Sequence, residues 1–165
     1  MTDTTSTNAI VLERTFDAPA TLIWQLWTEP EHFAAWYGPT GADISVVTMD
    51  VRVGGQRLVG MRMQTPGGEM QMWFTGEHVE VAPNQRLVYT ESMGDENGNV
   101  LAPADMGMPE GHPTTTTITV ELHEVGGRTT MVLTHEGIPA DSPGATGWQM
   151  ALDKLTTYAA AQGAH

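Results

Sequence analysis

Histidine and carboxylate side chains are the groups through which this sequence could carry out acid–base chemistry. His135 follows Met131 and Leu133 at intervals of two residues, a spacing that puts the three side chains on one face of a β-strand. If that face lines an apolar interior, His135 is directed at a bound molecule or acts as a general acid or base. A histidine that is merely buried or at the rim produces the same pattern, and we favour that interpretation.

Tyr89 and Glu91 form a second candidate pair, because they share one face of a predicted strand. A carboxyl group in an apolar cavity holds its proton more tightly than in water and can transfer it to a substrate. The same group on the solvent face of the sheet has no such role. The sequence does not determine which face carries Glu91, so both interpretations stay open.

Asp50 and Arg52 are separated by one residue and precede Gly54 and Gly55. This spacing predicts that the two charged side chains share a strand face, next to a tight turn that the glycines permit. In a functional interpretation, Arg52 anchors an anion. In a structural interpretation, which we favour, the two residues form a surface ion pair that holds a hairpin together.

The sequence contains no pattern that is typical of a metal or cofactor site. It has no cysteine, and its six histidines lack the close spacing of a metal-binding pair on a helix. A nucleophile elbow, a phosphate-binding loop and a dinucleotide-binding fingerprint are also absent. We therefore predict no metal site and no cofactor, and the sequence does not identify a catalytic residue.

The charge of the chain excludes two classes of partner. Seven Lys and Arg residues stand against 20 Asp and Glu residues, which gives a formal net charge of -13. Such an acidic protein repels nucleic-acid backbones and anionic lipid head groups, so we predict neither nucleic-acid nor membrane binding. We see no secretory signal and no apolar run near the roughly 20 residues of a membrane span. The lack of cysteine fits a reducing compartment, and we expect a soluble, cytoplasmic protein.

The pattern of apolar residues and turn signals predicts an α+β fold. The 165 residues suit a single domain, which we place at residues 9–162, after a disordered Thr- and Ser-rich tail at residues 1–8. Asp17 is the expected N-cap of the first of two short helices, and an apolar stripe predicts a long helix over 144–162. Gly, Pro and Asn residues mark the turns between strands. The predicted strands cover residues 9–16, 42–53, 57–64, 70–81, 86–93, 114–125 and 129–136.

A curved antiparallel sheet with a helix across its concave side leaves an interior cavity. The chain has 11 Met and 5 Trp residues, whose adaptable or large side chains suit a deformable pocket for a small hydrophobic molecule. The Gly- and Pro-rich segment from Gly94 to Pro113 is expected to be a mobile flap at the mouth of this cavity. The predicted ligand-binding residues are Trp24, Trp27, Met61, Met63, Tyr89, Glu91, Met131, Leu133, His135, Trp148 and Leu152.

Trp148 opens the apolar stripe of the long helix, and Gly147 before it is expected to let a neighbouring segment approach closely. A residue that walls a partly empty pocket has fewer packed neighbours than a core residue. We therefore expect Trp148→Ala to cost less stability than an ordinary truncation in a core.

Short motifs follow one another in a characteristic order: Phe16-Asp17-Ala18-Pro19 with Trp24 and Trp27, Pro30-Glu31-His32-Phe33, Trp36-Tyr37-Gly38-Pro39, Asp50-x-Arg52-x-Gly54-Gly55, Pro83 through Thr90, His135-Glu136-Gly137, and Gly147-Trp148 through Leu155. This ordered set resembles the heat-shock-protein-90 ATPase activator homologue family, a branch of the SRPBCC or START-like superfamily. The resemblance covers the chain from about Ile10 to Tyr158. It implies the helix-grip, or Bet v 1-like, fold, in which a curved antiparallel sheet wraps around a long C-terminal helix.

The family includes co-chaperone domains, small-ligand carriers and cyclase-like enzymes, so the resemblance implies a fold rather than one activity. Our first hypothesis is binding of a small, largely apolar ligand between the sheet and the C-terminal helix. The alternative is a cyclase- or hydrolase-like enzyme acting on a carbonyl-containing hydrophobic substrate in the same cavity. The third is a co-chaperone-like interaction domain with a chaperone partner. We place it last because the family's eukaryotic co-chaperones carry an N-terminal domain that these residues do not contain. A homodimer is also open.

Overall fold

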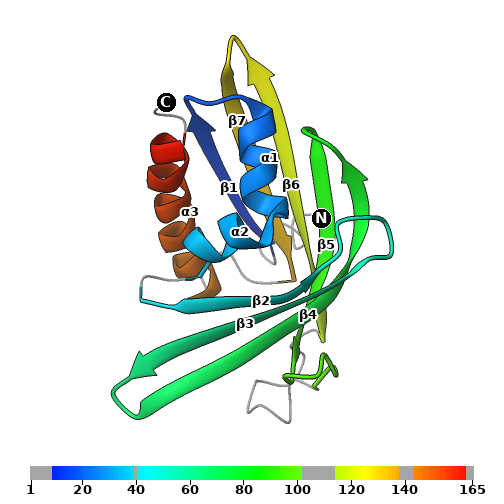
Figure 1. The fold of residues 1–165 in the computed structure, drawn as a ribbon, viewed down its shortest axis with the longest axis vertical. Coiled ribbons are helices and arrows are strands. Elements are labelled where there is room, and N and C mark those ends of the chain that lie inside the picture. Colours follow the sequence, from blue (N-terminus) through cyan, green and yellow to red (C-terminus); the bar gives the residue numbers. More distant parts are fainter. Residues whose placement is uncertain (1–8, 39–40, 102–113, 138–142, 163–165) are drawn as a thin grey trace, which may run out of the picture.

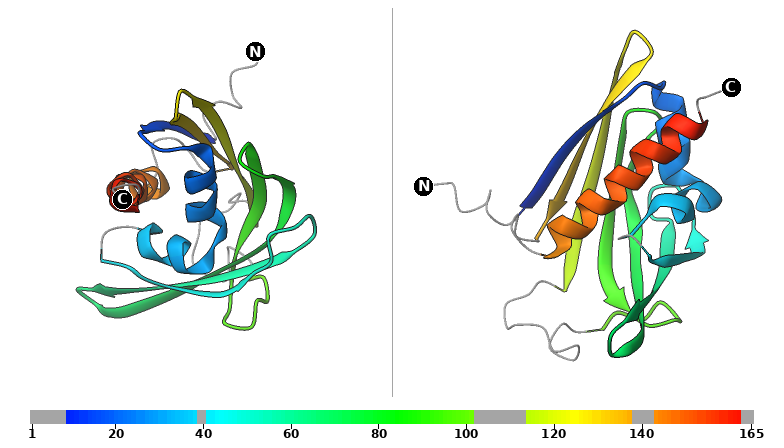
Figure 2. Two further views of the ribbon diagram at one scale, coloured as in Figure 1. Left: turned by 45° about the horizontal axis from the view of Figure 1, so that its top comes forward. Right: turned by 90° about the vertical axis from the view of Figure 1, so that its left-hand side faces the viewer.

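A seven-stranded antiparallel sheet curves around three helices in the described part of the chain (Figure 1 and Figure 2). This computed structural model describes residues 9–38, 41–101, 114–137 and 143–162, so the predicted tail at residues 1–8 lies outside it. The elements are β1 (Ala9–Phe16), α1 (Ala20–Thr28), α2 (Pro30–Trp36), β2 (Asp43–Met49), β3 (Gln56–Thr65), β4 (Gly68–Ala82), β5 (Arg86–Gly94), β6 (Thr115–Val125), β7 (Arg128–Glu136) and α3 (Pro143–Gln162).

The predicted α+β helix-grip arrangement is confirmed. The strand order is β1-β7-β6-β5-β4-β3-β2, so strands that follow one another from β2 to β7 are neighbours in the sheet. In β6, Thr116, Ile118, Val120 and Leu122 are buried, whereas His123 on the other face is exposed. This alternation is the period of two that gives a sheet one dry face and one wet face.

The start of α1 differs from the prediction, because Asp17 is not its N-cap. The helix begins at Ala20, and Pro19 is the N-cap residue, with extended backbone angles and no side-chain capping bond. Asp17 therefore stands two residues too early to reach the free amides. Glu124 at the end of β6 takes this role, since its Oε1 accepts a hydrogen bond from the Ala20 amide at 2.8 Å. A negative charge at a helix N-terminus is favourable.

The end of β2 also differs from the prediction. The strand stops at Met49, so Asp50 and Arg52 lie in a turn and do not share a strand face. A Cβ atom on Gly55 would lie 2.0 Å from the carbonyl oxygen of Asp50, so this tight turn requires glycine. Arg52 Nε donates to Asp50 Oδ2 at 2.7 Å, and both side chains are exposed. The predicted surface ion pair is thus confirmed.

An aromatic cluster packs where the three helices meet. The ring centroid of Trp27 on α1 lies 4.7 Å from that of Trp36 on α2 and 6.1 Å from that of Trp148 on α3. Phe33 and Tyr37 stack with their centroids 4.5 Å apart. All five side chains are buried. Such ring pairs contribute about 0.5–1.5 kcal/mol each beyond their burial, so they join the three helices.

The long helix α3 lies along the open side of the curved sheet, where it contacts β1, α1 and α2 (Figure 2). Its predicted apolar stripe is buried, with Trp148, Leu152, Leu155 and Ala159 all less than one-tenth exposed. None of the described helices has the length and apolar content that crossing a membrane requires.

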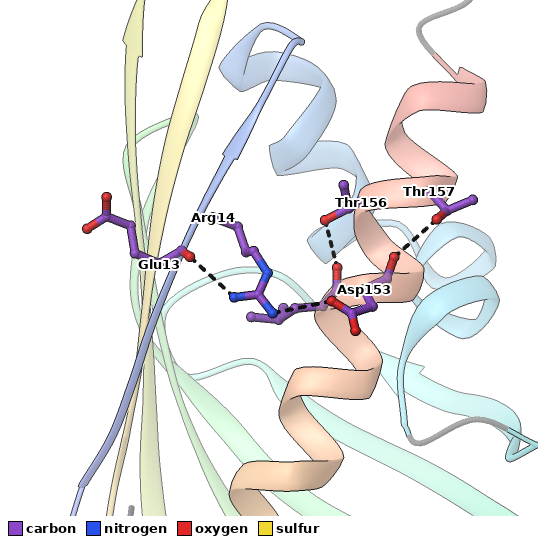
Figure 3. Close-up of polar contacts among 6 residues, drawn as sticks. Glu13, Arg14, Asp153, Thr156 and Thr157 are labelled. Carbon is purple, nitrogen blue, oxygen red and sulfur yellow. Dashed lines mark hydrogen bonds and ion pairs between the residues drawn. The ribbon is translucent and has the colours of Figure 1, made fainter.

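An ion pair links α3 to β1 beside this stripe (Figure 3). Arg14 Nη2 lies 3.3 Å from Asp153 Oδ1, and Arg14 Nη1 donates to the carbonyl oxygen of Glu13 at 3.3 Å. The hydroxyl groups of Thr156 and Thr157 donate to carbonyl oxygens one turn earlier in the helix. Because the Asp153 side chain is 76% exposed, the ion pair contributes at most about 1 kcal/mol. The apolar stripe, rather than this pair, holds the helix in place.

Candidate functional site

Methionine and phenylalanine side chains gather on the inner face of β3, β4 and β5. The strand register pairs these residues with one another, and directly paired residues project to the same face. Phe74 lies 6.5 Å from the ring of Tyr37, so this is the face toward the helices. Met61 is buried, whereas the others are only partly buried and Met70 is 41% exposed. We call this set the methionine surface; it comprises Met61, Met63, Met70, Met72, Phe74 and Met93.

Glu91 lies beside the methionine surface and points inward, which answers the question that the sequence leaves open. The hydroxyl group of Tyr37 donates to Glu91 Oε2 at 3.1 Å. Burial raises the pKa of Tyr37 well above its ordinary value, and the negative charge of Glu91 adds to this effect. The hydroxyl group therefore stays protonated and acts as a donor to the carboxylate.

His135 is held between Trp148 and Thr116. The indole Nε1–H of Trp148 donates to His135 Nδ1 at 2.9 Å, so Nδ1 is the acceptor nitrogen. The neutral ring then carries its proton on Nε2, which lies 2.8 Å from Thr116 Oγ1. The Thr116 hydroxyl donates in turn to the carbonyl oxygen of Glu91 at 3.3 Å. Because indole can only donate, this chain of hydrogen bonds fixes the tautomer of the histidine.

The network gives both ring nitrogens of His135 a partner within the protein. Burial lowers the pKa of His135, and the nearby charge of Glu91 opposes this shift only in part. A general base would have to exchange one of these partners for a substrate atom. The geometry therefore suits a structural link between α3, β6 and β7 better than acid–base catalysis.

Two buried histidines should make the stability of the protein depend on pH. Burial lowers the folded-state pKa of His135 and of His78, and the positive charge of Arg57 lowers that of His78 further. As the pH falls below about 6.5, the unfolded chain takes up protons before the folded chain does. Each histidine then reduces the free energy of unfolding by up to about 1.4 kcal/mol per pH unit until its folded-state pKa is reached.

Urea unfolding at about pH 7.5, 6.5 and 5.5 measures this loss. His135→Gln and His78→Gln are the matched variants, because glutamine does not titrate. Each variant should lose less stability than the wild type over the same pH interval. Parallel losses in all three proteins would show that other groups cause the pH dependence.

Arg57 is a candidate functional residue outside the set predicted from the sequence. It is 5% exposed, and its guanidinium carbon lies 3.6 Å from the ring centroid of Tyr89 and 5.2 Å from that of Phe33. Neither Arg57 Nη1 nor the Tyr89 hydroxyl has a hydrogen-bond partner in the described part of the chain. Burial raises the pKa of Tyr89, while the charge of Arg57 acts against this shift. The signal was present in the sequence, because Arg57, Val59 and Met61 alternate on one strand face.

The structure brings the sequence-predicted residues together in the interior. Their role in binding a ligand stays a prediction. Met61 and Met63 point inward on β3, as Tyr89 and Glu91 do on β5. Trp24, Met63 and Glu91 are partly buried. The buried members of the set are Trp27, Met61, Tyr89, Met131, Leu133, His135, Trp148 and Leu152.

Gly147 does not provide the predicted close approach. No atom lies within 4 Å of the position that a Cβ atom would take there, because this face of α3 is partly exposed.

The predicted flap from Gly94 to Pro113 falls mostly outside the described residues. In the described portion, the Asp95 carboxylate accepts hydrogen bonds from the amides of Asn97 and Asn99 at 2.9 and 3.0 Å, which forms a tight turn. Among the described residues, no group of three or more His, Cys, Asp or Glu side chains could hold a metal ion.

Comparison with protein families returns a match that spans most of the chain. The family model described as activator of Hsp90 ATPase homolog 1-like protein matches residues 17–160. This range includes every predicted ligand-binding residue and confirms the resemblance that the short motifs carry. No curated protein matches the chain.

Solved structures share the fold over nearly the whole chain. A protein from Chromobacterium violaceum is 26% identical with a TM-score of 0.73, and the match covers 91% of this chain and 95% of that one. A protein from Staphylococcus epidermidis is 24% identical with a TM-score of 0.74, with coverages of 100% and 97%. The AHSA1 protein from Silicibacter pomeroyi is 18% identical with a TM-score of 0.72, with coverages of 93% and 99%. Identities at this level establish a shared fold, and the ligand has to be inferred from the side chains themselves.

Proposed function

Because the chain belongs to the activator of Hsp90 ATPase homolog 1-like family, we propose that it binds a small, largely apolar molecule within its helix-grip fold. In this proposal the molecule lies between the sheet and α3, against the methionine surface and the aromatic cluster. The family alone does not supply a ligand, since one fold serves many activities. The argument therefore depends on the side chains that face the interior.

The incomplete burial of the methionine surface is the observation that carries the proposal. Met70 is 41% exposed, and Met63, Met72, Phe74 and Met93 are partly buried, although they lie on the inner face of the sheet. A complete hydrophobic core buries such side chains, because burial of each one stabilises a protein by about 1.5–3 kcal/mol. Methionine adapts its shape to irregular partners. An inner face of this kind favours a site that a bound molecule completes.

The polar groups of the interior support binding more than catalysis. His135 has a protein partner at both ring nitrogens, and Glu91 accepts a hydrogen bond from Tyr37. A cyclase- or hydrolase-like reaction would require one of these groups to leave its partner and meet a substrate atom. Binding of an apolar molecule requires no such rearrangement.

Titration with N-phenyl-1-naphthylamine, a neutral apolar probe whose fluorescence rises in dry surroundings, tests the proposal. We expect saturable binding with one probe per chain. Replacing Met63 and Met72 together with glutamine should weaken the affinity about tenfold, because a loss of about 1.4 kcal/mol of apolar contact corresponds to that factor. Native mass spectrometry of the purified protein would show a molecule that is already bound.

Val11→Gln is the matched control. Val11 is 62% exposed and lies on the outer face of β1, because its neighbour Ile10 is buried on the inner face. This variant should bind the probe as the wild type does. If the folded wild type shows no saturable probe binding, the proposed function is wrong.

A further inference from the structure

Arg57 differs from four other arginines of the chain in how its charge is balanced. Arg14, Arg52, Arg62 and Arg86 each form an ion pair with a carboxylate on the surface. Arg57 is 5% exposed and forms no ion pair within the described residues, although the chain has 20 Asp and Glu residues. Burying a charge is costly unless a partner compensates it. The burial of this one cation therefore calls for an explanation.

Stacking on Tyr89 explains only part of the arrangement. The ring face of Tyr89, 3.6 Å from the guanidinium carbon, stabilises the positive charge. The N–H groups of a guanidinium lie in its own plane, however, and Nη1 has no acceptor in the described part of the chain. The Tyr89 hydroxyl, a short distance along the same ring, also has no partner there. Because both groups can donate hydrogen bonds, a single acceptor could satisfy the two together.

The described side chains around Arg57 and Tyr89 do not supply this acceptor. The carboxylate of Glu91 accepts its hydrogen bond from Tyr37 and forms no ion pair with Arg57 within the described residues. His78 Nδ1 lies 3.2 Å from the carbonyl oxygen of Gly55, so it is engaged elsewhere. Arg57 therefore presents a positive charge to the interior of a protein whose net charge is -13.

We propose that the bound molecule carries a carboxylate at one end, which Arg57 and Tyr89 bind, while the methionine surface receives its apolar remainder. This inference rests on the proposed function, since it names the chemical class of the ligand for the same interior. A guanidinium binds a carboxylate through parallel charge-assisted hydrogen bonds, and the tyrosine hydroxyl adds a further donor. A neutral hydroxyl or ester group would leave the charge of Arg57 unbalanced.

Competition between an acid and the matching alcohol tests this inference. Decanoate and decan-1-ol are titrated separately, below their micelle-forming concentrations, against N-phenyl-1-naphthylamine bound to the full chain at about pH 7.5. Decanoate should displace the probe at about tenfold lower concentration, the factor expected for hydrogen bonds between charged groups. Arg57→Met keeps the apolar stem of the side chain and should abolish this preference while decan-1-ol binds as before. Tyr89→Phe should reduce the preference several-fold.

The outcomes separate this inference from the proposed function. If decan-1-ol displaces the probe as well as decanoate does, the inference is wrong and the proposed function stands. If the wild type binds neither the probe nor the competitors, the proposed function is wrong and the inference falls with it. If Arg57→Met lowers the thermal midpoint but keeps the preference for the acid, Arg57 is only a stacking partner and the inference is wrong. Should Arg57→Met fail to fold, an unchanged preference in Tyr89→Phe overturns it.

Discussion

Replacing Trp148 with alanine should lower the free energy of unfolding by about 3–5 kcal/mol. The residue is 6% exposed, and its ring centroid lies 6.1 Å from that of Trp27, 5.7 Å from Tyr37 and 6.0 Å from His135. Alanine would remove these contacts and leave His135 Nδ1 without its donor. This loss is larger than that of a pocket wall, because Trp27 on α1, Tyr37 just after α2 and His135 on β7 all contact the indole.

Two further variants separate packing from hydrogen bonding at this position. Trp148→Phe keeps an aromatic ring but removes the N–H group, so about 1–3 kcal/mol should be lost. Met150→Ala changes an apolar residue that is 37% exposed on the same helix, and its effect should stay within about 1 kcal/mol. Urea unfolding without ligand measures the free energy of unfolding of all three variants. If Trp148→Ala lowers the free energy of unfolding by less than about 1.5 kcal/mol, Trp148 is a pocket wall and not part of the packed core.

Most of the fold could be predicted from patterns between residues close in sequence. The burial of Ile118, Val120 and Leu122 follows from alternation along β6, and the buried stripe of α3 follows from helical spacing. Two consecutive glycines with positive φ, Gly126 and Gly127, form the turn between β6 and β7, as hairpin turns require. Each of these signals is complete within one element and its turn, so tertiary contacts did not alter it.

The candidate site could be predicted only in part, because its contacts join residues that are distant in sequence. The direction in which the Glu91 side chain points depends on the arrangement of the whole sheet. The pairing of β4 with β5 has a register shift between His78 and Glu80, which the spacing of residues along the chain does not reveal. The bond from Trp148 to His135 requires α3 to be docked, and no spacing rule predicts it. Arg57 was visible as one charged residue in an apolar alternation, but its lack of a partner appears only after folding.

Replacing Gly76 with alanine should cost about 3 kcal/mol or more, because the new methyl group has no space. A Cβ atom at this position would lie 1.9 Å from the carbonyl oxygen of Thr90 on the neighbouring strand β5. The obstructing atom belongs to the backbone, so no side-chain rotation relieves the overlap. The two strands would have to separate at the point where the Glu77 amide donates to Thr90 Oγ1 at 3.1 Å.

This separation should also impair binding, because Tyr89 and Glu91 flank Thr90 on β5. We therefore expect the affinity for N-phenyl-1-naphthylamine to fall together with stability in Gly76→Ala. Gly147→Ala is the matched control: no atom lies within 4 Å of its Cβ position, and alanine in a helix should raise stability by up to about 1 kcal/mol without changing probe binding. If Gly76→Ala unfolds at the same urea concentration as the wild type, β4 can move away from β5 without cost. The close contact at Thr90 would then not be what fixes Tyr89 and Glu91 in the interior.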